Sequence, residues 1–116
     1  MKENNPIVEK SKAFAIRIIR MCQHLAAEKK EVVLSKQVLR SGTSIGANVK
    51  EATRAHSKAD FIAKMQIALK EAGETEYWIE LLQETDYITE KAGESLLVDC
   101  RELLKMITAI IRTAKE

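Results

Sequence analysis

The sequence predicts an all-α protein, an antiparallel up-down-up-down four-helix bundle, and three observations support this. The 116-residue chain has one Pro and four Gly, too few for the many turns of an all-β fold. Its abundance of Ala, Leu, Ile, Glu, Lys and Arg is typical of long helices. Apolar residues recur at spacings of three and four in four separate segments. Four helices with short connections fill a single domain over residues 1–116.

The first predicted helix covers about residues 6–29. Asn5 suits the N-cap and Pro6 the first helical position. An apolar seam follows at helical spacing: Ile7, Ser11, Phe14, Ile18, Met21 and Leu25. Lys10 and Arg17 lie on the polar side, seven residues apart.

The second predicted helix covers about residues 35–56, with Ser35 as its N-cap. Gly42 and Gly46 lie in its middle, on or beside its apolar side. A glycine inside a helix costs about 1 kcal/mol relative to Ala. Two of them therefore predict a helix that its neighbours approach closely, the one against which the others pack.

Four cations form one stripe along the outer side of this helix: Lys36, Arg40, Lys50 and Arg54. One interpretation is a solvated face with compensating anions such as Glu51. The other is a phosphate-binding ridge, to which Lys10 and Arg17 of the first helix would add. Both interpretations stay open at this stage.

The third predicted helix covers about residues 58–84. Ser57 and Asp60 resemble a capping box, so the turn before this helix is very short and helices two and three are antiparallel neighbours. Trp78 lies beside the apolar seam rather than in it. This position favours a packing role over a ligand platform, and contact between subunits is one form of such packing.

The fourth predicted helix covers about residues 90–115, with Thr89 as its cap. Beside its core seam runs a second apolar row, Leu97, Leu104 and Ile111. A bundle helix needs an apolar face of roughly three residues in seven, and this helix has more. We therefore expect this row, together with Trp78, to form an oligomer interface.

Several short motifs then occur in a characteristic order. They are Arg40-Ser41-x-x-Ser44-Ile45-Gly46-Ala47-Asn48-Val49-x-Glu51, Asp60-Phe61-Ile62, Ile67-Ala68-Leu69 and Glu74-Thr75-Glu76-Tyr77-Trp78-Ile79. Over about residues 38–82 the chain resembles the four-helix bundle proteins encoded in intervening sequences of bacterial 23S ribosomal RNA genes. Lys50-Glu51-Ala52 departs from the small residue, Glu and Gly of many members; the departure leaves the fold expectation unchanged.

This resemblance implies a homopentameric ring of bundles without established enzymatic activity. The chain is also similar to the accessory variability protein of diversity-generating retroelements, a basic pentamer that binds RNA and works with a reverse transcriptase. By motif position, Arg40, Ser44, Asn48 and Glu51 are the signature polar residues of the family. A structural role accounts for most of them: hydrogen bonds from Ser44 and Asn48 to a neighbouring helix, and pairing of Glu51 with Arg54 or another helix.

Charge divides the chain into unlike halves. Residues 1–56 hold 11 Lys and Arg against 5 Asp and Glu, whereas residues 57–116 hold 8 against 12. Such an asymmetry is typical of a nucleic-acid-binding face or of two complementary surfaces that meet in an assembly. A head-to-tail contact between unlike surfaces closes into a ring when the rotation permits.

Enzymatic constellations are weak, and we expect a protein without catalytic activity, cofactor or metal. The two histidines lack the Glu-x-x-His spacing of di-iron bundles, and the chain has no glycine-rich phosphate loop. Cys22 and Cys100 sit in apolar stripes, which indicates buried, reduced thiols. The start of the chain lacks a signal-peptide pattern and no apolar run suits a membrane span, so we expect a cytoplasmic protein.

Two functions remain. The first is a homo-oligomer, expected to be pentameric, that binds nucleic acid, with structured RNA as the expected ligand. The contacts would come from Lys10, Arg17, Lys36, Arg40, Lys50 and Arg54. The second is a structural adaptor ring that recruits protein partners, such as a reverse transcriptase, without binding nucleic acid. Salt-sensitive retention of RNA distinguishes them.

Overall fold

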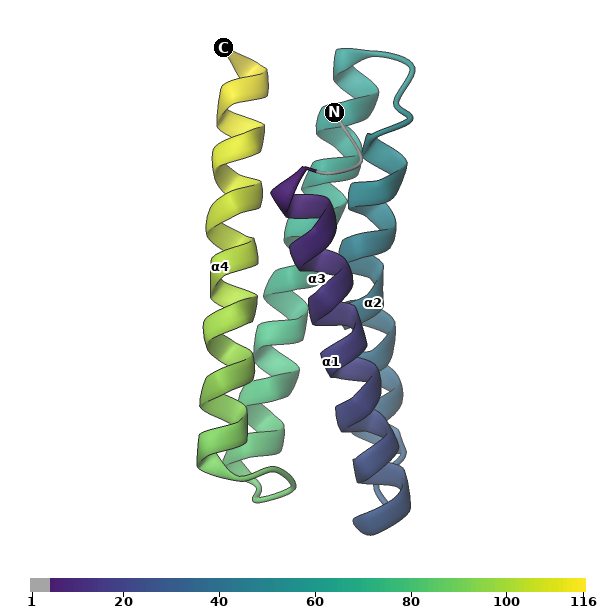
Figure 1. Cartoon of the computed structure of the whole chain (residues 1–116), viewed down its shortest axis with the longest axis vertical. Coiled ribbons are helices and arrows are strands. Elements are labelled where there is room, and N and C mark those ends of the chain that lie inside the picture. Colours follow the sequence, from purple (N-terminus) through teal and green to yellow (C-terminus); the bar gives the residue numbers. More distant parts are fainter. Residues whose placement is uncertain (1–4) are drawn as a thin grey trace.

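Four helices account for nearly all of residues 5–116, the part of the chain that the computed structural model describes. They are α1 (Pro6–Glu28), α2 (Val33–Ala52), α3 (Lys58–Glu84) and α4 (Glu90–Lys115), and this part contains no strand. The all-helical four-helix prediction is confirmed. The connections α1–α2 and α3–α4 lie at one end of the molecule, and the α2–α3 connection and the C-terminus lie at the other (Figure 1).

Side chains of three residues cap helix starts as the sequence predicts. The Asn5 side chain accepts a hydrogen bond from the Ile7 amide, Ser57 from the Asp60 amide and Thr89 from the Ala92 amide, each at 3.0 Å. Each bond satisfies a backbone N–H that has no partner within the first turn of a helix. The expected first residues of α1, α3 and α4 therefore agree with the structure.

The prediction for α2 is wrong at both ends. The helix begins at Val33. The Glu31 carboxylate accepts hydrogen bonds from the backbone amides of Val33 (3.2 Å) and Ser35 (2.9 Å), so Glu31 has the capping role that the sequence analysis gave to Ser35. The helix ends at Ala52 instead of His56, because tighter i→i+3 bonds then turn the chain, such as the 3.0 Å bond from the Arg54 amide to the Glu51 carbonyl. Arg54 thus lies beyond the helix rather than on its outer stripe.

One continuous core runs between the helices. Its largest fully buried side chains include Phe14, Ile18, Ile45, Met65 and Ile107. Each side chain of this size contributes about 1.5–3 kcal/mol when it leaves water. The apolar seams read from the sequence are therefore the surfaces that hold the fold together.

The two glycines of α2 lie where helices come close, as predicted. A Cβ atom added at Gly42 would lie 2.9 Å from both γ carbons of Ile18. One added at Gly46 would lie 3.4 Å from the carbonyl oxygen of Ser11, which belongs to the α1 backbone. The absence of side chains at these positions lets α1 rest against α2.

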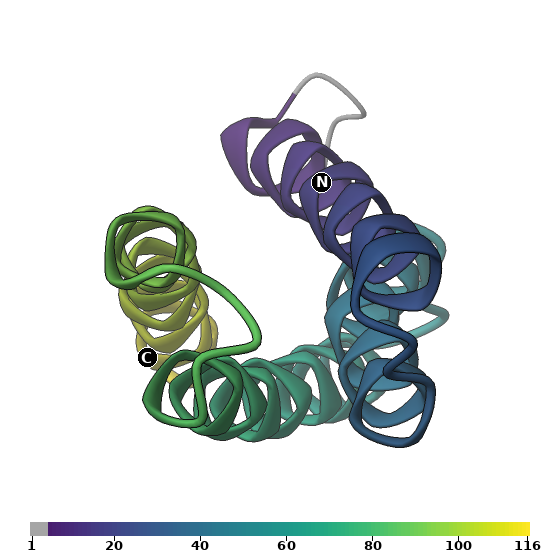
Figure 2. The same ribbon diagram turned by 90° about the horizontal axis from the view of Figure 1, so that it is seen from below.

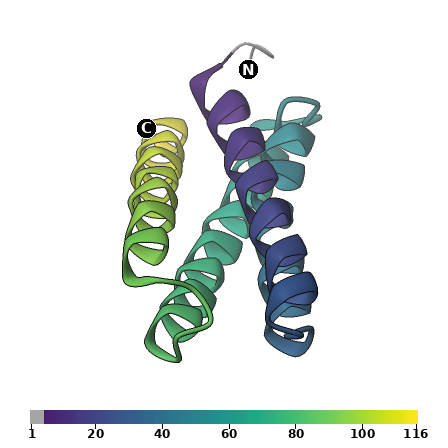
Figure 3. The same ribbon diagram turned by 60° about the horizontal axis from the view of Figure 1, so that its bottom comes forward.

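The first and last helices pack less closely than the other neighbouring pairs. Seen from below, the four helices follow one another around a U, with α1 and α4 as its two arms (Figure 2). The third helix runs obliquely from beside α2 to beside the start of α4 (Figure 3). Two ion pairs bridge α1 and α4, Lys10 to Glu102 at 2.9 Å and Arg17 to Asp99 at 2.7 Å.

The second apolar row of α4 is mostly covered by the chain itself. Leu97 and Ile111 are buried and Leu104 is half-buried. The expectation that one bundle cannot bury this row is therefore wrong for Leu97 and Ile111. The physical reason is that α4 has neighbours on two sides: Cys100 contacts α3, and Asp99 pairs with α1. Two stripes about 100° apart on one helix can both be covered in that arrangement.

Candidate functional site

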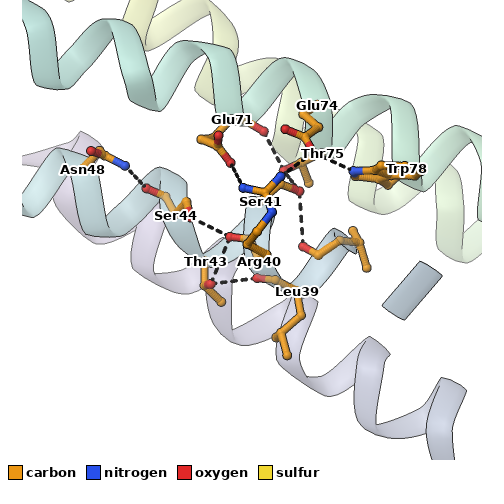
Figure 4. A network of polar contacts seen from close by, with 11 residues as sticks. Leu39, Arg40, Ser41, Thr43, Ser44, Asn48, Glu71, Glu74, Thr75 and Trp78 are labelled. Atoms are coloured by element: carbon orange, nitrogen blue, oxygen red, sulfur yellow. Dashed lines mark hydrogen bonds and ion pairs between the residues drawn. The ribbon is translucent and has the colours of Figure 1, made fainter. Parts of the chain in front are cut away.

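A polar network joins α2 to α3 and contains several of the motif residues. The Arg40 guanidinium bridges two carboxylates of α3: it donates to Glu71 at 2.9 Å and also to Glu74 (Figure 4). Glu74 accepts a further bond from the Trp78 indole at 3.2 Å. The hydroxyls of Ser41 and Thr75 lie 2.8 Å apart in the buried layer beneath.

The charges of this network stabilise one another. The hydrogen bond from Arg40 lowers the pKa of Glu74, and the indole of Trp78 acts in the same direction. The hydrogen bond to Glu74 and the charge of Glu71 raise the pKa of Arg40. Glu71 is buried, so without Arg40 its carboxylate would lose its countercharge in a place that water reaches poorly. The network therefore works as a clamp between α2 and α3.

This clamp changes the interpretation of Arg40, which the sequence placed in a phosphate-binding ridge. Its guanidinium is committed to two carboxylates within the chain. The sequence analysis did not identify Glu71 as the partner of Arg40, although the sequence contains a signal for this pairing. Across a short antiparallel turn, residues equally far from the turn lie at the same level, and Arg40 and Glu71 are 15 and 16 residues from Ala55.

The other signature polar residues bond within α2 instead of reaching a neighbouring helix. The Ser44 hydroxyl donates to the Arg40 carbonyl at 2.6 Å, and the Asn48 amide donates to the Ser44 carbonyl at 2.9 Å. Glu51 is exposed and forms no ion pair with any residue of 5–116. The expected contacts of these three residues to other helices are therefore not present in the described chain.

The six predicted phosphate contacts divide into two groups. Lys10, Arg17 and Arg40 pair with carboxylates of α3 or α4. Lys36 and Arg54 are exposed and form no ion pair with any described residue. Lys50 is half-buried and has a polar or charged interaction of its own. The fold therefore leaves the ridge discontinuous, with its free cations at the two ends of the stripe.

The predicted interface residues do not form one surface either. Trp78 and Leu104 are half-buried, whereas Leu97 and Ile111 belong to the core. Sequence reasoning did not assign Tyr77 to the interface. This residue is 55% exposed, and the centroid of its ring lies 5.5 Å from that of Trp78. A shallow groove on the outer side of α1 and α2 is a second exposed feature, and its lining includes Val8, Lys12, Ala15, Gly46 and Ala47.

Residues 5–116 hold two free cysteines and no cluster of metal ligands. Cys22 and Cys100 are free and buried, and burial raises the pKa of Cys22 to about 11 and that of Cys100 to about 12. Both are therefore protonated and unreactive at neutral pH. Among residues 5–116 no three His, Cys, Asp or Glu side chains cluster as metal ligands. No helix in this range is long and apolar enough to cross a membrane.

Comparison with known proteins identifies the family. Residues 3–109 match the family model described as 23S rRNA-intervening sequence protein. The chain belongs to this family. The resemblance seen in the motif residues is thereby confirmed, and the match extends beyond those motifs into α1 and α4.

A solved member of the S23 ribosomal protein family supports the same assignment. This protein of unknown function from Bacteroides thetaiotaomicron is 55% identical to the chain. The match covers 90% of this chain and 97% of that one, with a TM-score of 0.90. No curated protein sequence matches the chain.

Proposed function

We propose that the protein is a non-catalytic, cytoplasmic, homopentameric ring of up-down-up-down bundles that binds structured RNA. The observation that carries RNA binding is the pair of exposed cations Lys36 and Arg54, which the fold leaves without ion-pair partners among the described residues while it neutralises Lys10, Arg17 and Arg40. Cations of this kind bind phosphates through release of counterions. No aromatic residue interleaves the stripe, so base stacking contributes little there.

Retention of a structured RNA at two salt concentrations tests this function. The protein should retain the RNA at 50 mM salt and lose most of its affinity at 200 mM, because each phosphate contact adds to the salt dependence. Lys36→Glu combined with Arg54→Glu should weaken retention. If the unmutated protein fails to retain RNA at 50 mM salt, the proposed function is wrong.

The ring is supported by Gly73, in the middle of α3. A Cβ atom added there would meet no atom within 4 Å, so packing within the chain does not call for a glycine. A glycine at such a position nevertheless costs about 1 kcal/mol relative to Ala. Leu69 one turn before it is half-buried, and Tyr77 one turn after it is largely exposed. This α3 face, defined by Leu69, Gly73 and Tyr77, suits close approach by another subunit.

The surface that would meet this α3 face is the α1–α2 groove of the next copy. That groove is lined by small residues, Ala15, Gly46 and Ala47, and carries Lys12 among its lining residues. It belongs to the basic half of the chain, and the α3 face belongs to the acidic half. A contact between two different surfaces is head-to-tail, and it closes into a ring when the rotation between copies permits. Five is the number of copies that the family resemblance implies.

Gly73→Arg tests the ring without disturbing the bundle, since the space around this position is open. Light scattering of the unmutated protein should give about five times the 13.1 kDa chain mass. Gly73→Arg should shift the mass toward that of one chain, whereas Ala27→Arg, at an exposed position of α1, should leave it unchanged. A monomeric unmutated protein at micromolar concentration would contradict the ring.

An adaptor ring that recruits a protein partner such as a reverse transcriptase, without nucleic acid, is the second candidate. The observation that favours it is exposed apolar surface outside the α3 face. Val32 and Val33 at the α1–α2 connection are 51% and 71% exposed, and Val98 on α4 is 58% exposed. This function predicts a ring of the same mass that retains no RNA at low salt.

A further inference from the structure

The two ends of the bundle differ more in net charge than the two halves of any single helix do. Dividing each helix at its midpoint separates residues 5–17, 43–71 and 103–116 from residues 18–42 and 72–102. The first group, here the basic end, contains the α2–α3 connection and the C-terminus (Figure 1). It holds 11 Lys and Arg against 5 Asp and Glu, whereas the opposite, acidic end holds 7 against 11.

Most cations of the basic end form no ion pair with a described residue. Lys10 and Arg17 pair with α4, and Lys50 has an interaction of its own. The other eight form no ion pair with any residue of 5–116: Lys12, Arg54, Lys58, Lys64, Lys70, Lys105, Arg112 and Lys115. The four carboxylates of this end that form no ion pair with a described residue are Glu9, Glu51, Asp60 and Glu116. The eight cations outnumber them, and the resulting positive field at one end of the bundle is described neither by the sequence halves nor by the α2 stripe.

We propose that the RNA phosphate backbone docks on the basic end, across the α2–α3 connection and the last turn of α4. Arg54 and Lys58 flank the connection, and Arg112 and Lys115 lie in the last turns of α4 at the same end. The molecule is 22 by 19 Å across its two shorter axes. A nucleic-acid duplex with one phosphate per about 1.7 Å presents roughly a dozen phosphates over that width, more than these four side chains can contact.

This inference rests on the proposed RNA binding and relocates it. In the proposed function Lys36 and Arg54 act together, yet Lys36 lies in the first turn of α2 and Arg54 lies just beyond its last residue. Lys36 belongs to the acidic end, whose 11 Asp and Glu outnumber its 7 Lys and Arg and so disfavour a phosphate backbone. Of the two cations on which the proposed function rests, Arg54 therefore adds more to the RNA surface than Lys36.

Matched charge reversals test the assignment. Arg54→Glu with Lys58→Glu should weaken binding of a structured RNA at least tenfold at 100 mM salt, and should lower the slope of log affinity against log salt by about 2. Arg112→Glu with Lys115→Glu should give a similar loss. The control, Arg20→Glu with Lys91→Glu, changes the net charge equally at exposed positions of the acidic end and should bind within twofold of the unmutated protein.

The outcomes separate this inference from the function on which it rests. If the unmutated protein retains no RNA, the proposed function fails. If it retains RNA and both basic-end variants bind as well as the control, RNA binding stands and the basic end is wrong. Sedimentation with phosphatidylserine vesicles, lost in the basic-end variants while RNA is never retained, would assign this end to an anionic membrane instead.

Discussion

Replacement of Gly42 by Ala tests the packing of α1 on α2 most sharply. The added Cβ would lie 2.9 Å from both γ carbons of Ile18, closer than real Cβ atoms approach a neighbour, and 3.3 Å from its β carbon. Ile18 is fully buried, and a β-branched side chain in a helix has one strongly preferred rotamer. The clash therefore has to be relieved by a shift of α1 or of neighbouring core side chains.

Two effects of opposite sign decide the magnitude. Gly to Ala in a helix gains about 1 kcal/mol of intrinsic stability. Overpacking of a filled core costs about 1–3 kcal/mol. Gly42→Ala should therefore lower the free energy of unfolding by about 1 kcal/mol. Gly42→Leu should lower it by several, because the packed core has no space for the larger side chain.

Urea unfolding followed by circular dichroism, at one fixed protein concentration, measures the effect. Ala109→Gly, at an exposed position of α4, calibrates the helix-propensity term in this protein. Ile18→Ala removes both γ carbons, so in that background Gly42→Ala should cost nothing or stabilise, a coupling of about 1–3 kcal/mol. If Gly42→Ala stabilises the protein as much as Ala109→Gly destabilises it, α1 does not pack on Gly42 as described.

Three further predictions concern the clamp, a connection and the thiols. The hydrogen bond from Arg40 lowers the pKa of Glu74, so this bond stabilises the fold above the unfolded-state pKa of Glu74 and ceases to do so as the pH falls. The difference in unfolding free energy between the unmutated protein and Arg40→Leu should therefore shrink from pH 7 to pH 4. A difference that stays constant would contradict the clamp. Lys30 has a φ of 56°, so Lys30→Gly should stabilise by about 1 kcal/mol in urea unfolding; a loss of stability would show that its side chain matters more than its backbone strain. Cys22 and Cys100 should resist iodoacetamide at pH 7.5 and react once urea unfolds the chain, and rapid labelling of the native protein would show that they are accessible.

The fold was predictable because its signals are local. Asn5, Ser57 and Thr89 mark helix starts by the chemistry of their own side chains, and the apolar spacing within each helix identifies the buried face. Glu31 was missed because it lies before the helix that it caps. Ser35, which lies inside the first turn of α2, is a more common type of N-cap residue and was chosen instead. Local signals thus locate helices better than they locate helix ends.

The candidate site was less predictable because it depends on which charges meet. A cation on an outer stripe looks free in the sequence, but Arg40 is held by Glu71 and Glu74, and Arg17 by Asp99, 82 residues away. These pairings follow from the register of neighbouring helices, which no single helix encodes. The axial separation of charge has the same origin: α1, α3 and α4 each contribute three cations to the basic end, and only the alternation of helix directions gathers them there.

Affinity for a structured RNA as a function of salt tests the proposed function most directly. With about four phosphate contacts, the association constant should fall roughly 100-fold between 50 and 200 mM salt. The Arg20→Glu, Lys91→Glu control should show the same dependence, and the Arg54→Glu, Lys58→Glu variant should show about half the slope. No binding at 50 mM salt, or binding that salt leaves unchanged, would contradict an RNA-binding function.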